Sequence, residues 1–341
     1  ARAGLQDGRK NRPDPQHHTI RSRTAEPLDL RDCLGSVYTH GKHSQESAEQ
    51  GLAAAMALPS GWLGQADNFL GIDEPWCHPG QAGVYVLPAP YEHTSSYILG
   101  SDRGPSAIIE ASQQVELYDE TLRYEPYREW GGVATATTLN LDGRVDGQAV
   151  QAIQDFVQPH AGRGKFLVTL TGEHTGALGA IRAHAQQYPG MCVVQIDAHG
   201  DLRQAYQDNP YSHASVMARV VQDGLPLVQV GIRSISPEEV ELIDKTPRIN
   251  TFFAASILDP SGPYEGRASR WIPDVVASCT GPVYLTFDCD GLDASLVPAL
   301  GTPEPGGLGW YDTLALVTAL ANGPGIVGMD ISEIAPIEGF V

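Results

Sequence analysis

The sequence predicts an α/β protein, in which a mainly parallel sheet lies between two layers of helices in a three-layer α/β/α arrangement. From about residue 83 onward, short apolar runs rich in β-branched residues alternate with segments of helical period. Alternation at this spacing is typical of a parallel sheet with helices on both faces. No internal repeat of about 20–50 residues is visible, so a solenoid or propeller is not expected.

The expected elements follow from these runs in chain order. The strand candidates are 83–87, 166–170, 192–196, 227–230, 251–254, 283–287 and 325–329. The helix candidates between them are 105–117, 147–158, 175–188, 214–223, 237–243, 268–277 and 310–322. Because the two kinds of segment alternate, the strands are expected to pair in parallel through helical crossovers.

Residues 1–80 are predicted to form an N-terminal extension that is partly flexible. The first 50 residues are polar, relatively rich in basic residues for so acidic a chain, and without periodicity. About the first 25 residues are therefore interpreted as a flexible arm or a partner-binding segment. A short helix is expected at 47–58, and 61–80 is expected to be a loop.

Composition excludes several classes of protein. The 341 residues include 42% hydrophobic residues, a share that fits an ordinary globular protein. No run of about 18 apolar residues and no charged-then-apolar N-terminus is present, so neither a membrane span nor a signal peptide is expected. The five cysteines are odd in number and form no CxxC pair, which argues against disulfides and thiolate zinc sites and favours the cytoplasm.

The formal net charge of the chain is −19 at pH 7. This charge argues against a nucleic-acid partner, because phosphate binding needs patches of lysine and arginine. An acidic protein suits a small cationic substrate, although many proteins are acidic for solubility alone.

Carboxylates and imidazoles follow four of the predicted strands at the point where each strand ends. They are Glu173 and His174, then Asp197, His199 and Asp201, then Asp288 and Asp290, and finally Asp330 and Glu333. Open parallel sheets place their sites just beyond the carboxyl ends of the strands. Alternate residues of an extended segment share a face, so the middle two sets can each converge.

These residue types at these positions predict a centre of two metal ions. Oxygen and imidazole ligands without thiolates suit borderline-hard divalent ions such as manganese. One ion would leave several carboxylates repelling one another, whereas two ions neutralise them. Paired ions about 3.5–4 Å apart lower the pKa of water toward about 7 and so supply a nucleophile. A lone DxD motif is usually surface or capping chemistry, but four such strand ends together favour the metal centre.

Three segments also carry a resemblance to a known family. They are Asp-Ala-His-Gly-Asp at 197–201, Phe-Asp-Cys-Asp-Gly-Leu-Asp at 287–293 and Gly-Thr-Pro-Glu-Pro-Gly-Gly-Leu at 301–308. These segments look like signatures of the ureohydrolase family, which contains arginase, agmatinase, guanidinobutyrase and formiminoglutamase. Tyr-Ser-His-Ala at 211–214 resembles the agmatinase branch.

The resemblance implies an arginase-like fold and a ureohydrolase catalytic domain at 81–341. The sequence stops at residue 341, before the final helices that the family carries, so it is either incomplete or unusually short there. Departures from the family pattern, such as Thr171, Ala214 and Ser332, remove no ligand. The resemblance also implies a homo-oligomer, either a trimer or a hexamer.

By resemblance, each subunit holds two Mn²⁺ ions. One ion would be held by His174, Asp197, Asp201 and Asp288. The other would be held by Asp197, His199, Asp288 and Asp290, so that Asp197 and Asp288 bridge the pair.

The resemblance also assigns catalytic roles. His213 matches the family's active-site histidine, a proton shuttle at the mouth of the site, and Glu333 matches the carboxylate that grips a guanidinium group. Asp201, next to the metals, could pass a proton to the leaving amine. The implied reaction splits a guanidino compound into urea and an amine, with agmatine giving putrescine as the first expectation.

Three alternatives stay open on the sequence. Guanidinobutyrate, guanidine, arginine or formiminoglutamate could replace agmatine, with Arg203 as a candidate cation for an acidic substrate. A deacetylase-like hydrolase with a single zinc could use the same fold class, although His174 and Asp201 favour two metals. A non-catalytic metal-bound scaffold is disfavoured by His213 and Glu333, because a purely structural site has no need of them.

Overall fold

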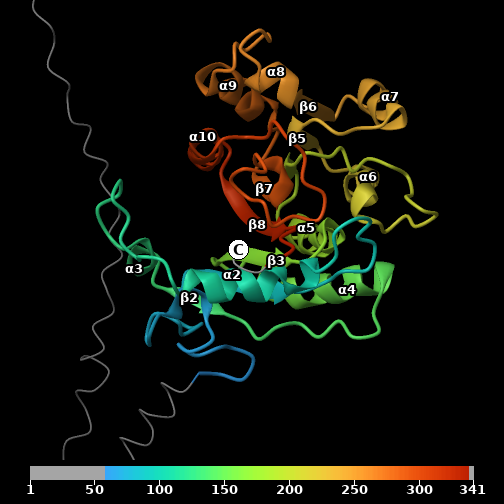
Figure 1. Ribbon diagram of the computed structural model, residues 1–341. Helices are drawn as coiled ribbons and strands as arrows, with labels where there is room; N and C mark the ends of the chain where they lie inside the picture. Colours follow the sequence, from blue (N-terminus) through green and yellow to red (C-terminus); the bar gives the residue numbers. More distant parts are fainter. Residues whose placement is uncertain (1–57, 338–341) are drawn as a thin grey trace, which may run out of the picture. The chain divides into compact units, whose positions relative to one another are not determined.

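Eight parallel strands form the centre of the described part of the protein (Figure 1). The computed structural model describes residues 58–337, so the predictions for the arm and nearly all of the helix at 47–58 lie outside the described residues. The strands are β1 (Val84–Ala89), β2 (Val133–Thr135), β3 (Phe166–Thr171), β4 (Cys192–Ile196), β5 (Leu227–Ile232), β6 (Ile249–Phe253), β7 (Val283–Asp288) and β8 (Ile326–Ser332).

Helices and single 3-10 turns connect these strands. The helices are α2 (Gly104–Ser112), α3 (Pro126–Glu129), α4 (Asp146–Val157), α5 (Ala177–Ala185), α6 (Val216–Gln222), α7 (Pro237–Lys245), α8 (Ala254–Leu258), α9 (Ala268–Ser278) and α10 (Trp310–Asn322). The turns are η1 (Phe69–Gly71), η2 (Ser101–Arg103), η3 (His174–Gly176), η4 (His213–Ser215) and η5 (Cys289–Gly291). None of the helices in residues 58–337 is long and apolar enough to cross a membrane.

The side chains of alternate strand residues are buried on opposite faces of the sheet. Val193 of β4 packs in the cluster that contains α4, α5 and α6, whereas its neighbours Cys192 and Val194 pack with Trp271 of α9 and Leu316 of α10. This period of two is what a strand covered on both faces requires. The predicted three-layer α/β/α fold with a parallel sheet is therefore confirmed.

The structure differs from the element predictions in several places, and the short helices α3 and α8 were not predicted. All seven predicted strands are present, but the three-residue strand β2 was missed because it has no apolar run of its own beyond Val133 and Ala134. The predicted strand at 251–254 starts earlier, and Ala254 begins the helix α8 instead. The loop expected at 61–80 contains the turn η1, and Trp62 packs edge-on against Tyr85 with ring centroids 4.5 Å apart.

The strand order explains where the site forms. The order is β2-β1-β3-β8-β7-β4-β5-β6, so the four strands that end in carboxylates and imidazoles are neighbours in the middle of the sheet. Each of their pairings is parallel, and their carboxyl ends therefore meet at one edge. These four strands come from distant parts of the sequence, and only the crossovers bring them together.

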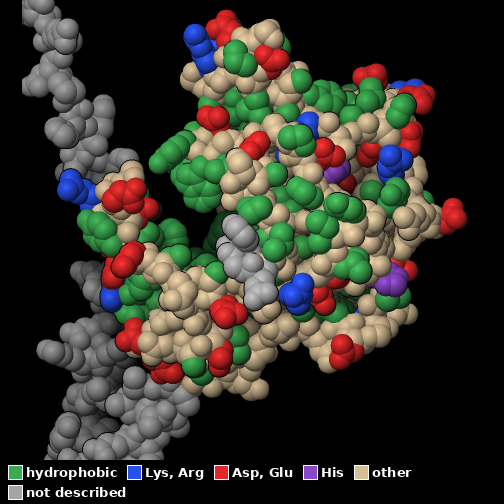
Figure 2. Space-filling view, viewed as in Figure 1, with side chains coloured by type: hydrophobic (Ala, Val, Ile, Leu, Met, Phe, Trp, Pro, Cys, Tyr) green, Lys and Arg blue, Asp and Glu red, His purple; other side chains and the backbone are tan. Residues whose placement is uncertain are grey.

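An apolar groove of about 730 Å³ lies over the half of the sheet that β2, β1, β3 and β8 form. Its floor includes Val84 and Val86 of β1, Val168 of β3, and Met329 and Ile331 of β8. Figure 2 shows hydrophobic side chains around a hollow on this face of the molecule. The residues that line the groove contribute little polar character, so it differs in kind from the acidic site at the strand ends.

Candidate metal centre

The six predicted ligand side chains meet at the carboxyl ends of β3, β4 and β7. Two groups have ligand atoms within 4.8 Å of one another, namely His174, Asp197 and Asp288 in one and Asp197, His199 and Asp290 in the other. Asp197 belongs to both groups, so the two positions adjoin. Asp201 joins the first group, because its Oδ2 lies 2.9 Å from His174 Nδ1.

Asp197 sits at the centre of this arrangement and is fully buried. Its Oδ2 accepts a hydrogen bond of 2.6 Å from the side-chain amide of Gln195, and its Oδ1 accepts one of 2.6 Å from the backbone N–H of His199. Gln195 is held in turn by Gln229 on β5, whose amide donates to it over 2.7 Å. A carboxylate fixed by two donors from the protein presents its remaining lone pairs in a defined direction.

Close backbone approach brings the β7 loop against the end of β4. A Cβ added to Gly291 would lie 2.6 Å from the backbone nitrogen of Asp197, so glycine is required directly after Asp290. Two carboxylates of the site have left-handed backbone, with φ of 53° at Asp201 and 66° at Glu333. Such a conformation costs on the order of 1 kcal/mol for a residue with a Cβ, and it is often found at functional sites.

Burial and mutual repulsion suppress ionisation of several of these carboxylates. Burial and the nearby charge of Asp197 raise the pKa of Asp201 to about 7. Burial, Asp290 and Asp197 hold the pKa of Asp288 well above its usual range. Asp197 differs, because hydrogen bonds to His174 and His199 outweigh its burial and lower its pKa.

The two histidines respond in the opposite sense. Burial disfavours the charged imidazole of His174, but hydrogen bonds to Asp197 and Asp201 outweigh it and hold its pKa well above the usual range. Burial likewise opposes charging of His199, and hydrogen bonds to Asp197 and Asp290 raise its pKa to about 12. The shifts in the pKa values of the carboxylates and the histidines have one cause, the crowding of negative charge at this buried position, which divalent cations could neutralise.

Glu333 is a buried carboxylate beside this cluster. Its Oε1 accepts a hydrogen bond of 2.7 Å from the backbone N–H of His174, and a Cβ added to Gly301 would lie 3.3 Å from its Oε2. Burial and the charge of Glu173 hold the pKa of Glu333 well above its usual range. Within residues 58–337, Glu333 forms no ion pair with a lysine or arginine.

His213 lies in the pocket that opens above the cluster, and Thr94 fixes its ring. The Oγ1 of Thr94 is 2.8 Å from Glu173 Oε1 and 3.0 Å from His213 Nδ1. A carboxylate only accepts, so the hydroxyl proton of Thr94 goes to Glu173 and Nδ1 of His213 must donate to Thr94. That tautomer leaves Nε2 of His213 as a free acceptor. Burial lowers the pKa of His213, which favours the neutral ring.

The pocket itself has a volume of about 250 Å³. It is lined by residues from four loops, which include His199, Asp201, Tyr206, His213 and Thr302. Arg203 also faces the pocket, but its guanidinium is paired with Glu238 at 2.6 Å and lies over the ring of Tyr206. His93, in the loop after β1, is not among the lining residues; it is exposed and donates its backbone N–H to Glu173 over 2.8 Å.

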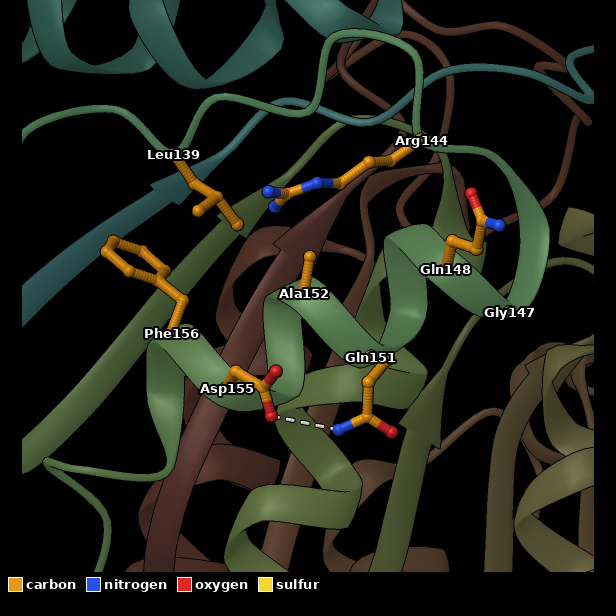
Figure 3. Close-up of a pocket in the computed structure, with 8 residues that line it drawn as sticks. All are labelled: Leu139, Arg144, Gly147, Gln148, Gln151, Ala152, Asp155 and Phe156. Atoms are coloured by element: carbon orange, nitrogen blue, oxygen red, sulfur yellow. Dashed lines mark hydrogen bonds between the residues drawn. The ribbon is translucent and has the colours of Figure 1, made fainter.

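A larger pocket of about 660 Å³ lies elsewhere, against α4, and lacks the chemistry of the strand ends (Figure 3). Its polar side chains include Arg144, Gln148 and Asp155, and Asp155 accepts a hydrogen bond of 2.9 Å from Gln151. The eight residues that line it include neither a histidine nor a pair of carboxylates. Size therefore does not identify the functional site in this protein.

Comparison with known proteins agrees with the geometry of the strand ends. A model of the arginase family matches residues 82–339.

The chain belongs to the arginase family.

Relatives within the family act on guanidino compounds according to their names. An N(1)-aminopropylagmatine ureohydrolase of Synechocystis sp. is 40% identical over 266 residues, covering 76% of this chain and 84% of that protein. An agmatinase of Bacillus anthracis is 30% identical over 270 residues, covering 76% and 87%. The crystal structure of an agmatine ureohydrolase of Thermoplasma volcanium matches with a TM-score of 0.64 and 27% identity, covering 84% of this chain and 89% of that one.

Membership of the arginase family confirms the predicted resemblance and the enzyme class. The chain is an agmatinase-like ureohydrolase, a hydrolase of linear amidine C–N bonds. The family depends on a binuclear metal centre. The donor set described above fits such a centre, because it offers oxygen and imidazole ligands in two adjoining groups and no thiolate among the ligand atoms.

Several supporting residues of this arginase-family site were missed by sequence reasoning. Glu173 was grouped with the strand-end carboxylates but given no role, yet it is fully buried and its Oε2 accepts the backbone N–H groups of His93, Thr94 and Ser95. Arg233 belongs to no motif, yet its guanidinium donates to six backbone carbonyls, five in the segment after β7 and that of Gly231 in β5. No sequence signal marks a residue whose partners are backbone atoms of distant loops.

Proposed function

We propose that the protein is a two-manganese hydrolase that splits a guanidino compound into urea and an amine, with agmatine, which gives putrescine, as the first candidate substrate. The observation that carries this proposal is a buried carboxylate, Glu333, that has no cationic partner within residues 58–337 and lies beside two adjoining groups of candidate metal ligands. A buried carboxylate without a partner is unfavourable, and a planar guanidinium would supply both charge and paired N–H donors.

The metal ligands in this proposal follow the two groups. His174, Asp197, Asp201 and Asp288 would hold one Mn²⁺ ion, and Asp197, His199, Asp288 and Asp290 would hold the second. When bound, a pair of divalent ions supplies a nucleophile at neutral pH by acidifying water.

Glu333 orients the substrate. Its carboxylate accepts the guanidinium N–H groups through charge-assisted hydrogen bonds and places the guanidinium carbon next to the metal ligands. The backbone N–H of His174 holds one oxygen of Glu333 at 2.7 Å, so the orientation of the carboxylate is set before the substrate arrives. Fixing the substrate in this way converts a slow bimolecular attack into a reaction within one complex.

Protons leave and return through two further residues. Asp201, which lies 2.9 Å from His174 Nδ1 among the proposed metal ligands, could pass a proton to the leaving amine. His213, neutral and with Nε2 free, can exchange protons between the pocket and bulk water. Thr94 and Glu173 hold the His213 ring in that orientation through the hydrogen bonds described above.

A second candidate substrate is N(1)-aminopropylagmatine, which the name of the 40% identical relative favours. The open pocket above the cluster leaves a path for a substituted agmatine. Acidic substrates are less well supported, because Arg203 is already paired with Glu238, and Glu304 adds a carboxylate 3.9 Å from His199 Nε2. A cytoplasmic location and a homo-oligomeric state, trimer or hexamer, belong to the same proposal, and light scattering of the purified protein tests the oligomer.

Urea release by manganese-loaded protein tests the proposal against agmatine, N(1)-aminopropylagmatine, arginine, guanidinobutyrate and guanidine. Turnover of either of the first two well above the rest supports the function and decides the substrate. The matched control is Glu333→Gln, which keeps the shape but removes the charge and is expected to raise KM and lower kcat while two ions remain bound. Two bound metals with no urea from any compound would refute the reaction, and a single bound zinc would favour the deacetylase-like alternative.

A further inference from the structure

A chain of buried side chains runs from the candidate ligand His174 into the sheet. Nε2 of His174 lies 2.8 Å from the hydroxyl of Thr286 on β7, and that hydroxyl donates over 3.0 Å to Oδ1 of Asp330 on β8. His174, Thr286 and Asp330 are all at most 1% exposed. Thr286 and Asp330 are paired in register on neighbouring strands, so the backbone of the sheet fixes their separation.

The direction of these hydrogen bonds decides which nitrogen of His174 faces the cluster. Asp330 as a carboxylate only accepts, so the single hydroxyl proton of Thr286 points to it. The oxygen of Thr286 is then left to accept, and Nε2 of His174 must be the donor. Nδ1 is consequently directed at Asp197 and Asp288, at 3.1 and 3.4 Å, as a ligand atom would be.

Asp330 has its own surroundings in the core. It is fully buried, and Thr169 is its register partner on β3. The hydroxyl of Tyr284, also fully buried, lies beside Asp330 and Thr169, and burial together with Asp330 holds the pKa of Tyr284 well above its usual range. Tyr284 therefore keeps its proton next to a buried carboxylate. A carboxylate in the core that touches neither the pocket nor a lysine or arginine among residues 58–337 has no evident role in folding alone.

We propose that Asp330 is a positioning residue of the metal centre, which holds the His174 imidazole through the Thr286 hydroxyl in the tautomer and orientation that direct Nδ1 to the metal. The inference rests on the proposed two-metal function and adds a residue to it that contacts neither metal nor substrate. Partners of this kind, one step behind a ligating histidine, commonly change metal affinity about 10–100-fold when they are lost.

Isosteric variants separate this role from a general effect on packing. Thr286→Val removes the hydroxyl but keeps the shape, and Thr286→Ser restores the hydroxyl. Thr169→Val is the matched control, because Thr169 is also a fully buried strand threonine beside Asp330 but makes no hydrogen bond to His174. Asp330→Asn keeps the volume and removes the charge.

Titration calorimetry with Mn²⁺ on metal-free protein, supported by circular dichroism to verify folding, tests the proposal. Thr286→Val and Asp330→Asn are expected to weaken one manganese site about 10–100-fold, while Thr286→Ser and Thr169→Val stay within about threefold of wild type. Thr286→Val with wild-type affinity, or Thr169→Val weakened to the same degree, would overturn the role of Asp330 and leave the proposed function standing. Wild-type protein that binds no manganese would refute the metal centre itself.

Discussion

Arg233 offers the sharpest test of how the loops around the site are held. It follows β5 and is partly buried, and its guanidinium reaches 290–292 and 304–305 in the connection between β7 and α10. Its acceptors are all backbone carbonyls, those of Gly231, Asp290, Gly291, Leu292, Glu304 and Pro305. A planar fork with five N–H donors suits this task, and no other side chain offers one.

The expected loss follows from the shortest of these contacts. The carbonyls of Asp290, Glu304 and Pro305 lie 2.6, 2.8 and 3.0 Å from the guanidinium nitrogens. A hydrogen bond to a charged group contributes about 1.5–3 kcal/mol, and water can replace part of each bond because Arg233 is not fully buried. Arg233→Ala should therefore lower the free energy of unfolding by about 3 kcal/mol, which corresponds to about 6–12 °C in melting temperature for a domain of this size.

Thermal unfolding of metal-free protein in EDTA measures the effect without a contribution from bound ions. Arg233→Lys, which supplies a point charge without the fork, should lose about half as much. The control is Arg182→Ala, which removes a surface pair with Asp223 of 2.7 Å and should cost at most about 1 kcal/mol. If Arg233→Ala melts at the same temperature as Arg182→Ala, six backbone contacts contribute no more than one surface ion pair and the reasoning is wrong.

Three further predictions concern the site and the backbone. Asp288→Asn should lose manganese and urea release together, which metal analysis of the dialysed protein and a urea assay measure. His213→Ala should keep its metal and lower kcat about 10²–10⁴-fold, and normal turnover would remove its proton-shuttle role. Gly132→Ala puts a Cβ 1.9 Å from the Trp76 carbonyl oxygen at a φ of +116°, so no folded protein is expected by circular dichroism. Its control is Gly190→Ala, which has φ of +78° and open space around it and should cost only about 1 kcal/mol.

The strands were predictable wherever the local sequence of each one has the apolar pattern of a buried strand. The apolar runs of β4, β5 and β7 are buried along their length, and such runs can be recognised without knowing which strands they pair with. Strand order is different, because it depends on which crossover packs against which face. The sequence therefore predicted that the strand ends carry ligands, but not that β8 lies between β3 and β7, which brings Glu333 next to His174.

The site shows the same division between local and distant signals. The motif at 197–201, in which acidic and histidine residues alternate, can be recognised in the sequence because metal binding requires these residue types at this spacing. The roles of Thr94 and Thr286 could not be predicted in this way. Threonine is common in loops and strands, and each of these two acts only through a partner far along the chain. Thr94 is 119 residues from His213, and Thr286 is 112 residues from His174.

The electrostatic cost of the buried carboxylates at this site would be relieved by bound cations. Asp201, Asp288 and Glu333 are buried carboxylates whose pKa values are raised, so the protein resists placing their charges there. Asp201 and Glu333 in addition adopt left-handed backbone. Bound cations reverse the sign of the electrostatic cost, because each carboxylate then gains an opposite charge in surroundings of low dielectric constant. The properties that make these buried charges costly are therefore those that would favour divalent ions at the base of the site and a guanidinium at Glu333 under the proposed function.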